Sequence, residues 1–310
     1  MKKIFKLIAA LFVLCAMIFP TKSFASSDPN SEEFMAFREA LTKDSDSPER
    51  IFRQDIFFAS PFVQSELDIL GMIDGGMFKC SGDFSLWIYG DDGSVSEKVI
   101  PFYVEQNKKE MNIYFKPKKQ WQKFTAPSLS AAVTDFVATP TEKEIEQIIR
   151  ETKDVTIMQD NPYRKILLVR LDGNAIADSF RKLADENPAD NGTAEEAALQ
   201  ETIVGYFENA FRNGDMWYMW TIDKRDWHTV TMQFSFTGLL QELARAALND
   251  PNQQWPDEVS QLFETIGYYS EIRAYTTYPA DPKAKSKIEV PKDVLKKAKP
   301  VKDLVGSETK

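Results

Sequence analysis

Cysteine is scarce in this sequence. Two of the 310 residues are cysteines, and one of them, Cys15, lies in an apolar run near the N-terminus. Cys80 stands alone in the rest of the chain, so an intramolecular disulfide is excluded once that run is removed, and stability must come from a packed core. We interpret Cys80 as a small buried strand residue, and a reactive or intermolecular thiol is the alternative.

Histidine is scarcer still, because His228 is the single one. One histidine cannot supply a multi-histidine metal site, and no Gly-x-Ser-x-Gly motif supports a serine hydrolase. No Gly-Lys-Ser/Thr follows the glycines at 75–76 or 90–93, so no phosphate-binding loop is indicated. Acidic pairs such as Asp91 and Asp92 fall at turns or helix starts, where capping accounts for them. We therefore predict a protein that is not an enzyme and binds no metal and no cofactor, with a hydrolase as a distant alternative.

Basic residues are outnumbered. The chain has 38 Lys and Arg against 47 Asp and Glu, for a formal net charge of -9. Residues 1–25 carry four lysines and no acidic residue, so their removal lowers the charge to about -13. A general nucleic-acid binder presents a basic face, and this balance argues against one.

The N-terminus has the pattern of an export signal. Lysines precede an apolar run at 7–19, and small residues at Ser23 and Ala25 predict cleavage after Ala25. Leu14 precedes Cys15 where a lipid-attachment signal needs a small residue. We expect residues 1–25 to be a signal peptide and the mature protein to be periplasmic or extracellular.

The mature chain of about 285 residues is interpreted as one domain with tails. Residues 26–50 form an N-terminal helix and loop, 51–278 a single half-barrel domain, and 279–310 a Lys- and Pro-rich tail with an edge strand at 288–291. Period-2 patterns and aromatic, β-branched runs predict strands at 51–59, 63–73, 84–89, 99–104, 111–115, 121–124, 155–158, 165–171, 216–222, 227–236 and 270–278. Period-3.6 patterns predict helices at 31–41, 141–149, 175–184, 193–212, 239–248 and 259–266.

Several strands are apolar on both faces, which predicts a covering layer on one face and a ligand or second cover on the other. Hairpins separated by helices favour an α+β fold with a curved antiparallel β-sheet, a half-open β-barrel, whose concave face is covered by α-helices. The residues that we expect to line an apolar cavity are Phe84, Leu86, Ile88, Phe102, Val104, Tyr114, Trp121, Trp217, Met219 and Trp220. Thr229 and Thr231 alternate with apolar residues and are expected on a solvated face.

Four features carry a family resemblance: strands that end in Pro101-Phe-Tyr103, the segment from Tyr114 through Trp121 to Lys123, a Met- and Trp-rich hairpin, and the element at 288–294. Together they resemble the LolA-like group of secreted proteins. That group includes the periplasmic lipoprotein carrier, its outer-membrane receptor, mycobacterial lipid-carrying lipoproteins and a sigma-factor regulatory protein. The resemblance covers most of residues 51–294. It implies a half-open β-barrel with a helical lid over a hydrophobic cavity that takes acyl chains.

Two functions follow as hypotheses. The first is an exported binding protein that binds or carries a lipid, a lipidated protein or another apolar ligand, with peripheral membrane contact and no nucleic acid partner. The second is an envelope sensor or regulatory module that contacts a protein partner and holds no ligand. Six Trp and 22 Phe fit either reading, since they also fill an ordinary large core.

Overall fold

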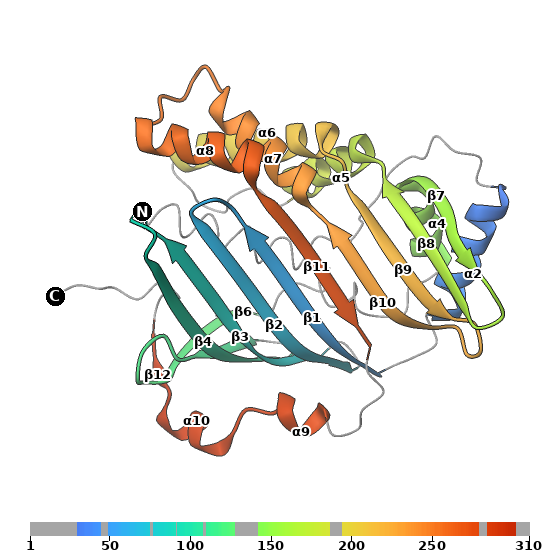
Figure 1. The fold of residues 1–310 in the computed structure, drawn as a ribbon, viewed down its shortest axis with the longest axis horizontal. Helices are drawn as coiled ribbons and strands as arrows, with labels where there is room; N and C mark the ends of the chain where they lie inside the picture. The colour runs from blue at the N-terminus through green and yellow to red at the C-terminus, as the bar shows by residue number, and fades with distance from the viewer. Residues whose placement is uncertain are drawn as a thin grey trace.

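The protein is built on one large sheet. The computed structural model describes residues 30–44, 49–74, 77–90, 92–107, 110–127, 142–186, 194–278 and 284–301. Twelve strands in these ranges form a sheet of order β12-β6-β5-β4-β3-β2-β1-β11-β10-β9-β8-β7. Neighbouring strands are antiparallel, apart from the short parallel pair of β12 and β6. The sheet curls without closing into a barrel (Figure 1).

Apart from the edge strand expected at 288–291, the predicted strands and helices are present with shifted ends, and the helices at 284–288 and 292–297 are additional. The strands are β1 (Glu49–Ala59), β2 (Val63–Asp74), β3 (Met77–Tyr89), β4 (Val95–Gln106), β5 (Glu110–Phe115), β6 (Gln122–Pro127), β7 (Thr152–Asp160), β8 (Arg164–Leu171), β9 (Trp217–Asp223), β10 (His228–Ser235), β11 (Glu271–Thr277) and β12 (Lys299–Pro300). The helices are α2 (Glu32–Asp44), α4 (Glu142–Arg150), α5 (Gly173–Glu186), α6 (Ala194–Asn213), α7 (Thr237–Leu248), α8 (Asp257–Tyr269), α9 (Ala284–Ile288) and α10 (Lys292–Lys297).

Strand alternation places most of the buried apolar side chains of the sheet on one face, its concave face. In β1 the even-numbered residues from Phe52 to Phe58 are buried, whereas Arg53 is exposed. Ile56 lies opposite Leu67 of β2 and Ala274 of β11, so these side chains share the face of Ile56. The same register carries the face outward to β5 on one side and to β7 on the other.

Helices cover half of the concave face. We call the buried residues there the core cluster, which draws on α2, α4, α5, α6, α7 and α8 as well as on β1 and β7 to β11. Its fully buried members include Phe34, Phe37, Ile56, Leu167, Val169, Phe211, Met216, Ile222 and Ile272. Figure 1 shows α5, α6 and α7 together along the upper ends of the strands. This half is therefore a conventional two-layer core.

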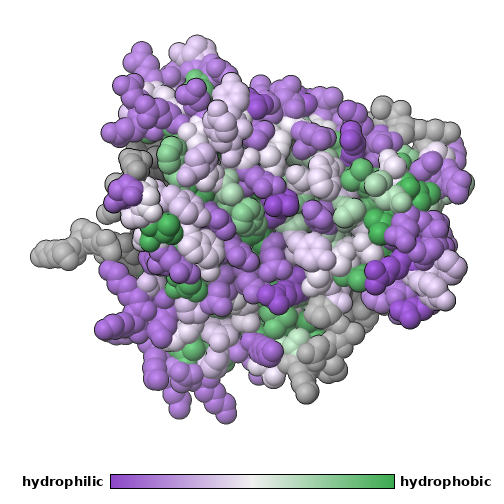
Figure 2. Space-filling model, viewed as in Figure 1, coloured by the Kyte–Doolittle hydropathy of each residue, from purple (hydrophilic) through white to green (hydrophobic). Residues whose placement is uncertain are grey.

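The opposite, convex face is polar over its centre. Arg53 of β1 donates to Asp68 of β2 (Nη2 to Oδ2, 2.8 Å), and both side chains are well exposed. Figure 2, seen from the same side as Figure 1, shows a surface on which hydrophilic residues are mixed with scattered hydrophobic ones. Nearer β5, Val290 and Val294 of the C-terminal segment pack on Tyr114, with Tyr103, Trp121 and Ala298 around them. We call this group the outer cluster.

The predicted fold class is confirmed, since the structure is α+β with an open, curved and mostly antiparallel sheet and helices on its concave face. The edge strand expected at 288–291 is instead found at Lys299–Pro300, because Ile288 ends helix α9 and is fully buried. Residues 1–25 and the apolar segment at 128–137 lie outside the described residues. None of the described helices is long and apolar enough to cross a membrane.

Candidate functional site

A second apolar group occupies the concave face away from the helices. Its buried members are Phe52, Ile69, Cys80 and Val104, and Leu67, Ile73, Phe78, Phe102, Met111, Ile113 and Tyr278 pack against them. We call these residues the strand cluster. They come from β1 to β5 and, for Tyr278, from the end of β11, so within the described chain no helix residue belongs to the cluster. Among the described residues, strand side chains alone make up this apolar surface, which we call the floor.

Aromatic rings lie over glycines on this floor. A Cβ at Gly71 would be 2.2 Å from Cζ of Phe52, and a Cβ at Gly82 would be 2.9 Å from Cζ of Phe102. Each glycine lies across the sheet from its phenylalanine, because Phe52 pairs with Gly71 and Phe102 with Gly82. The missing side chains leave room for the ring atoms of Phe52 and Phe102 close to the backbone of the neighbouring strand.

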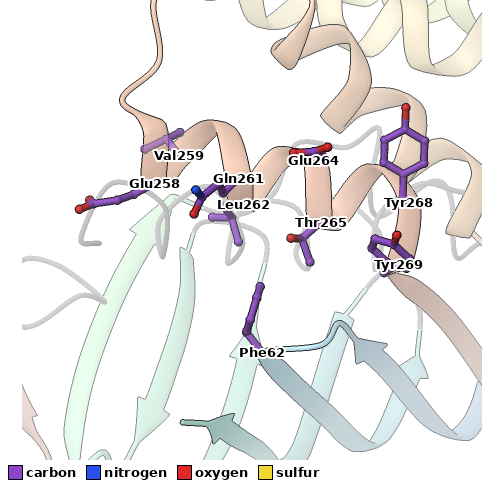
Figure 3. A pocket seen from close by; sticks show the side chains of 9 residues that line it. All are labelled: Phe62, Glu258, Val259, Gln261, Leu262, Glu264, Thr265, Tyr268 and Tyr269. Atoms are coloured by element: carbon purple, nitrogen blue, oxygen red, sulfur yellow. The ribbon is translucent and has the colours of Figure 1, made fainter. Parts of the chain in front are cut away.

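A groove opens between α8 and the turn before β2. Its volume is about 920 Å³, and it is lined by Phe62, Glu258, Val259, Gln261, Leu262, Glu264, Thr265, Tyr268 and Tyr269. Figure 3 shows Phe62 directed toward α8, with Leu262 and Thr265 on the side of the helix that faces it. Phe62, Tyr268 and Tyr269 are strongly exposed for large hydrophobic side chains. The groove is open to solvent and combines apolar side chains with two glutamates, Glu258 and Glu264.

Leu67 connects the groove region with the floor. Leu67 packs against both the strand cluster and the core cluster. Val63 and the groove residue Leu262 are partly buried and also pack against the core cluster. Between the two clusters on β1, Gln54 is buried and donates from Nε2 to Thr276 Oγ1 at 3.3 Å. This satisfied polar pair separates Phe52 from Ile56 and marks where the floor meets the helix-covered core.

Cys80 lies in the middle of the floor and is 2% exposed. Burial away from water raises the pKa of its thiol, and a hydrogen bond with the backbone of Val104 opposes that effect only in part. A protonated, buried thiol is a poor nucleophile. This agrees with the interpretation of Cys80 as a packed strand residue.

The structure brings five of the expected cavity residues onto the concave face of two neighbouring strands. They are Phe84, Leu86 and Ile88 of β3 and Phe102 and Val104 of β4. Phe102 and Val104 belong to the strand cluster itself, while Ile88 is 47% exposed at the end of β3, where it pairs with Val63 beside Phe62. These five expected cavity residues therefore lie along one apolar strip of the concave face.

Two other expected cavity residues lie on the convex face. Tyr114 and Trp121 belong to the outer cluster, where Val290 and Val294 cover them. The rings of Tyr103 and Trp121 are 5.6 Å apart between centroids. At Tyr114 and Trp121, the second apolar face predicted for these strands is therefore covered by the C-terminal segment of the same chain.

The Trp-rich strand β9 divides its side chains between both faces. Trp220 is 2% exposed and lies in the core cluster, where its ring meets Phe37 of α2 edge-on at 6.0 Å. Trp217 and Met219 alternate with it and face the convex side, half-buried. Trp220 is thus a core residue covered by helix α2. Trp217, Met219 and Trp220 all lie outside the strand cluster.

The expected exposure of Thr229 is wrong, because it is 3% exposed and accepts a hydrogen bond from Trp220 Nε1 at 2.8 Å. The register of β10 against β9 shifts between Thr229 and Thr231, which marks a β-bulge. A bulge inserts one residue and moves the side chains before it to the other face. Thr229 therefore joins the apolar face, while Thr231 stays on the convex one.

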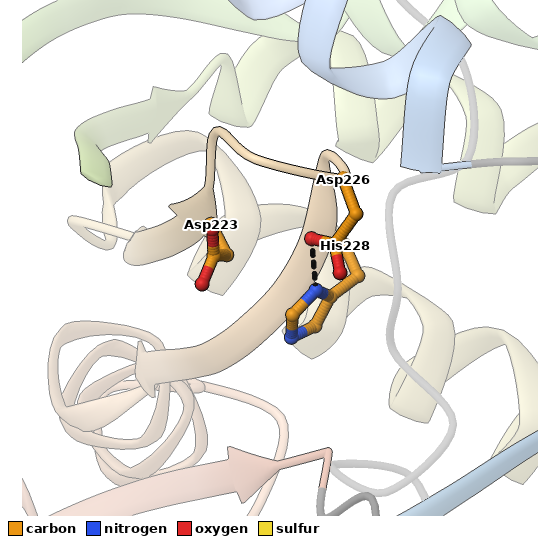
Figure 4. A group of neighbouring side chains, drawn as sticks. All are labelled: Asp223, Asp226 and His228. Carbon is orange, nitrogen blue, oxygen red and sulfur yellow. Dashed lines mark hydrogen bonds and ion pairs between the residues drawn. The ribbon is translucent and has the colours of Figure 1, made fainter. Parts of the chain in front are cut away.

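A small polar group at the β9–β10 turn has the residue types of a metal site. Donor atoms of Asp223, Asp226 and His228 lie within 4.8 Å of one another (Figure 4). Asp223, however, accepts from Arg225 (Nε to Oδ1, 2.9 Å), and this pairing holds the pKa of Asp223 well below its usual range. Nδ1 of His228 is 2.5 Å from Oδ1 of Asp226. The Asp223–Arg225 ion pair and the hydrogen bond between His228 and Asp226 account for the arrangement.

Sequence reasoning did not select the groove residues. Leu262 was placed correctly on the apolar stripe of its helix, yet a stripe does not reveal which of its members borders an opening. Phe62 follows Pro61 in a turn, and an aromatic residue at a turn tip was the available signal.

No known protein family and no curated protein sequence matches this chain. Among solved structures, a DUF1329 family protein from Desulfovibrio piger aligns over 84% of this chain and 100% of that chain, with 10% sequence identity and a TM-score of 0.17. We therefore infer the function from the geometry of the site.

Proposed function

We propose that this protein binds the acyl chain of a lipid or lipidated protein on the concave face of β1 to β5 and carries it in the cell envelope. The observation that supports this most is the composition of the strand cluster. In the described chain it is an apolar floor made of strand side chains, beside a groove that opens to solvent. An acyl chain needs such a surface and no polar partner.

The proposed path of the ligand has three parts. The chain enters between Phe62 and Leu262, passes Leu67, and lies along Phe102 and Phe52 on the floor. The ring atoms of Phe52 and Phe102 beside Gly71 and Gly82 give the methylenes of the ligand an aromatic surface to pack against. Glu258 and Glu264 at the groove would remain in water with the polar end of the ligand.

The LolA-like resemblance supports the same proposal. An open, curved sheet with helices on its concave face is compatible with the half-barrel of that group. The expected export signal would bring the protein into the compartment where such carriers work.

The experiment compares a groove-filling variant with a matched control. Thr265→Trp places a large ring in the groove, whereas Asn252→Trp places the same ring on an exposed loop before α8. We expect Thr265→Trp to weaken binding of a fatty acid that carries an environment-sensitive fluorophore by about tenfold or more, since a displaced chain loses roughly 0.8 kcal/mol for each methylene. Asn252→Trp should bind like the wild type. Equal binding by both variants would contradict the proposed path, provided that both melt cooperatively.

A further inference from the structure

Strand β4 extends beyond its outer neighbour. It pairs with β3 from Val95 to Glu105, but with β5 only from Phe102 to Gln106. The last link on the outer side is a hydrogen bond from Lys116 N to Pro101 O at 3.1 Å. Across the described residues, no strand lies beside β4 from Val95 to Ile100, so these residues border the sheet. In Figure 1 this end of the sheet lies at the left.

The two hairpins show which backbone groups point outward. Gly90 N donates to Ser94 O at 2.8 Å. The even-numbered residues of β4 therefore direct their backbone N–H and C=O groups toward β3. Asn107 N donates to Glu110 O at 3.0 Å on the other side, so the odd-numbered residues direct their N–H and C=O groups away from β3. Val95, Glu97 and Val99 therefore present their backbone groups at the border.

Pro101 agrees with this assignment. Pro101 is one of the odd-numbered residues of β4, whose backbone N–H groups point away from β3. Its missing N–H therefore removes no hydrogen bond between β4 and β3. Its carbonyl still accepts from Lys116, as noted above. The border thus runs from Val95 to a proline that ends it.

The side chains along this border are exposed and form no described ion pair. Val95 and Val99 are 57% and 48% exposed, and Glu97 and Lys98 between them are also exposed. An exposed edge with β-branched residues is a template for an added strand. Adjacent acidic and basic residues on opposite faces give that template a charge pattern.

The charge pattern disfavours a second copy of the same chain. An antiparallel, two-fold pairing that uses all of residues 95–99 is centred on Glu97 and places Glu97 opposite itself. A pairing centred on Lys98 opposes that lysine to itself. Like charges directly opposite each other destabilise a strand pair.

We propose that the edge of β4 from Val95 to Val99 binds an extended segment of another protein by antiparallel strand addition. The complementary segment has apolar residues opposite Val95 and Val99, a Lys or Arg opposite Glu97 and an Asp or Glu opposite Lys98. Main-chain hydrogen bonds hold the segment, and the two charged pairs set its register. This interaction does not depend on the binding of an apolar ligand.

Two labelled peptides test the proposal on the full mature chain by fluorescence anisotropy. The matched peptide is Thr-Val-Asp-Lys-Ser-Val-Thr, and the control, Thr-Val-Lys-Asp-Ser-Val-Thr, has its charges exchanged. We expect the wild type to bind the matched peptide about tenfold more tightly, because two cross-strand pairs change from attraction to repulsion. The double variant Glu97→Lys with Lys98→Glu should reverse the preference. Failure of the wild type to bind either peptide, or an unchanged preference in the double variant, would overturn the proposal.

Val99→Pro tests the backbone part. It removes an outward N–H and leaves the ladder to β3 in place, so both peptides should lose binding while the cooperative melt remains. Undiminished binding by this variant would overturn strand addition. If the wild type is instead a dimer that Val99→Pro converts to monomers, the edge binds a second copy, and the assignment of a different partner is overturned. If Val99→Pro does not fold, the peptide preference of the Glu97→Lys and Lys98→Glu double variant decides between the outcomes.

Discussion

Trp220 donates its indole N–H to the hydroxyl of Thr229 across the β9–β10 pair, at 2.8 Å and out of contact with water. The bond exists because the bulge in β10 turns Thr229 toward the core. It lets a tryptophan lie beneath α2 with its polar atom satisfied.

The first prediction concerns this bond. Thr229→Val keeps the shape of the side chain but leaves the indole N–H without its acceptor, so the free energy of unfolding should fall by about 1–3 kcal/mol. Urea denaturation measures the change. Thr231→Val, the same substitution on the convex face, is the control and should change stability by less than about 0.5 kcal/mol. Equal losses in the two variants would refute the role of the bond.

The second prediction concerns the glycine under Phe102. A Cβ at Gly82 would lie 2.0 Å from the backbone oxygen of Asp68, and a backbone atom cannot swing aside. Gly82→Ala should therefore destabilise the protein by about 1–3 kcal/mol. Gly205→Ala in α6 has nothing within 4 Å of the new Cβ and should stabilise it by roughly 0.5–1 kcal/mol. Thermal melts that show the same sign for both would count against the packing described for the floor.

The third prediction concerns the pH dependence that Cys80 causes. Burial raises the pKa of its thiol in the folded state, so the unfolded state loses that proton first as the pH rises. The stability linked to this group is present below its unfolded pKa of about 8.5 and declines above it, by at most about 1.4 kcal/mol per pH unit. Urea denaturation between pH 7 and 9.5 should show this decline in the wild type.

Cys80→Ala is the comparison, and its stability should depend less steeply on pH over that range. Tyr218 is also buried with a raised pKa, but its unfolded pKa of about 10 keeps it out of most of the window. Parallel pH curves for wild type and Cys80→Ala would show that the thiol is not buried as described.

Much of the fold could be predicted because period-2 and period-3.6 patterns are local. The alternation of Val230, Met232 and Phe234 identified β10, and the stripe of Val259, Leu262 and Ile266 identified α8. Thr229 was misplaced because a bulge changes the face of a residue without changing the pattern around it.

The site was harder to predict because burial depends on what covers each face. Phe102 and Val104, expected to line a cavity, lie in the strand cluster, but nothing local distinguishes them from Trp220, which a helix covers. Tyr114 and Trp121 are covered by a segment about 170 residues further along the chain, and such long-range packing leaves no periodic signal.

The central claim, that the floor holds an acyl chain, is tested most directly by affinity against chain length. Saturated fatty acids of increasing length compete with a fluorescent fatty acid for the wild-type protein. Each methylene is worth about 0.8 kcal/mol, so affinity should rise about fourfold per methylene and then level off when the floor and groove are full. No binding at micromolar concentration, no dependence on length, or a rise without a plateau, as for adsorption to the surface, would contradict it.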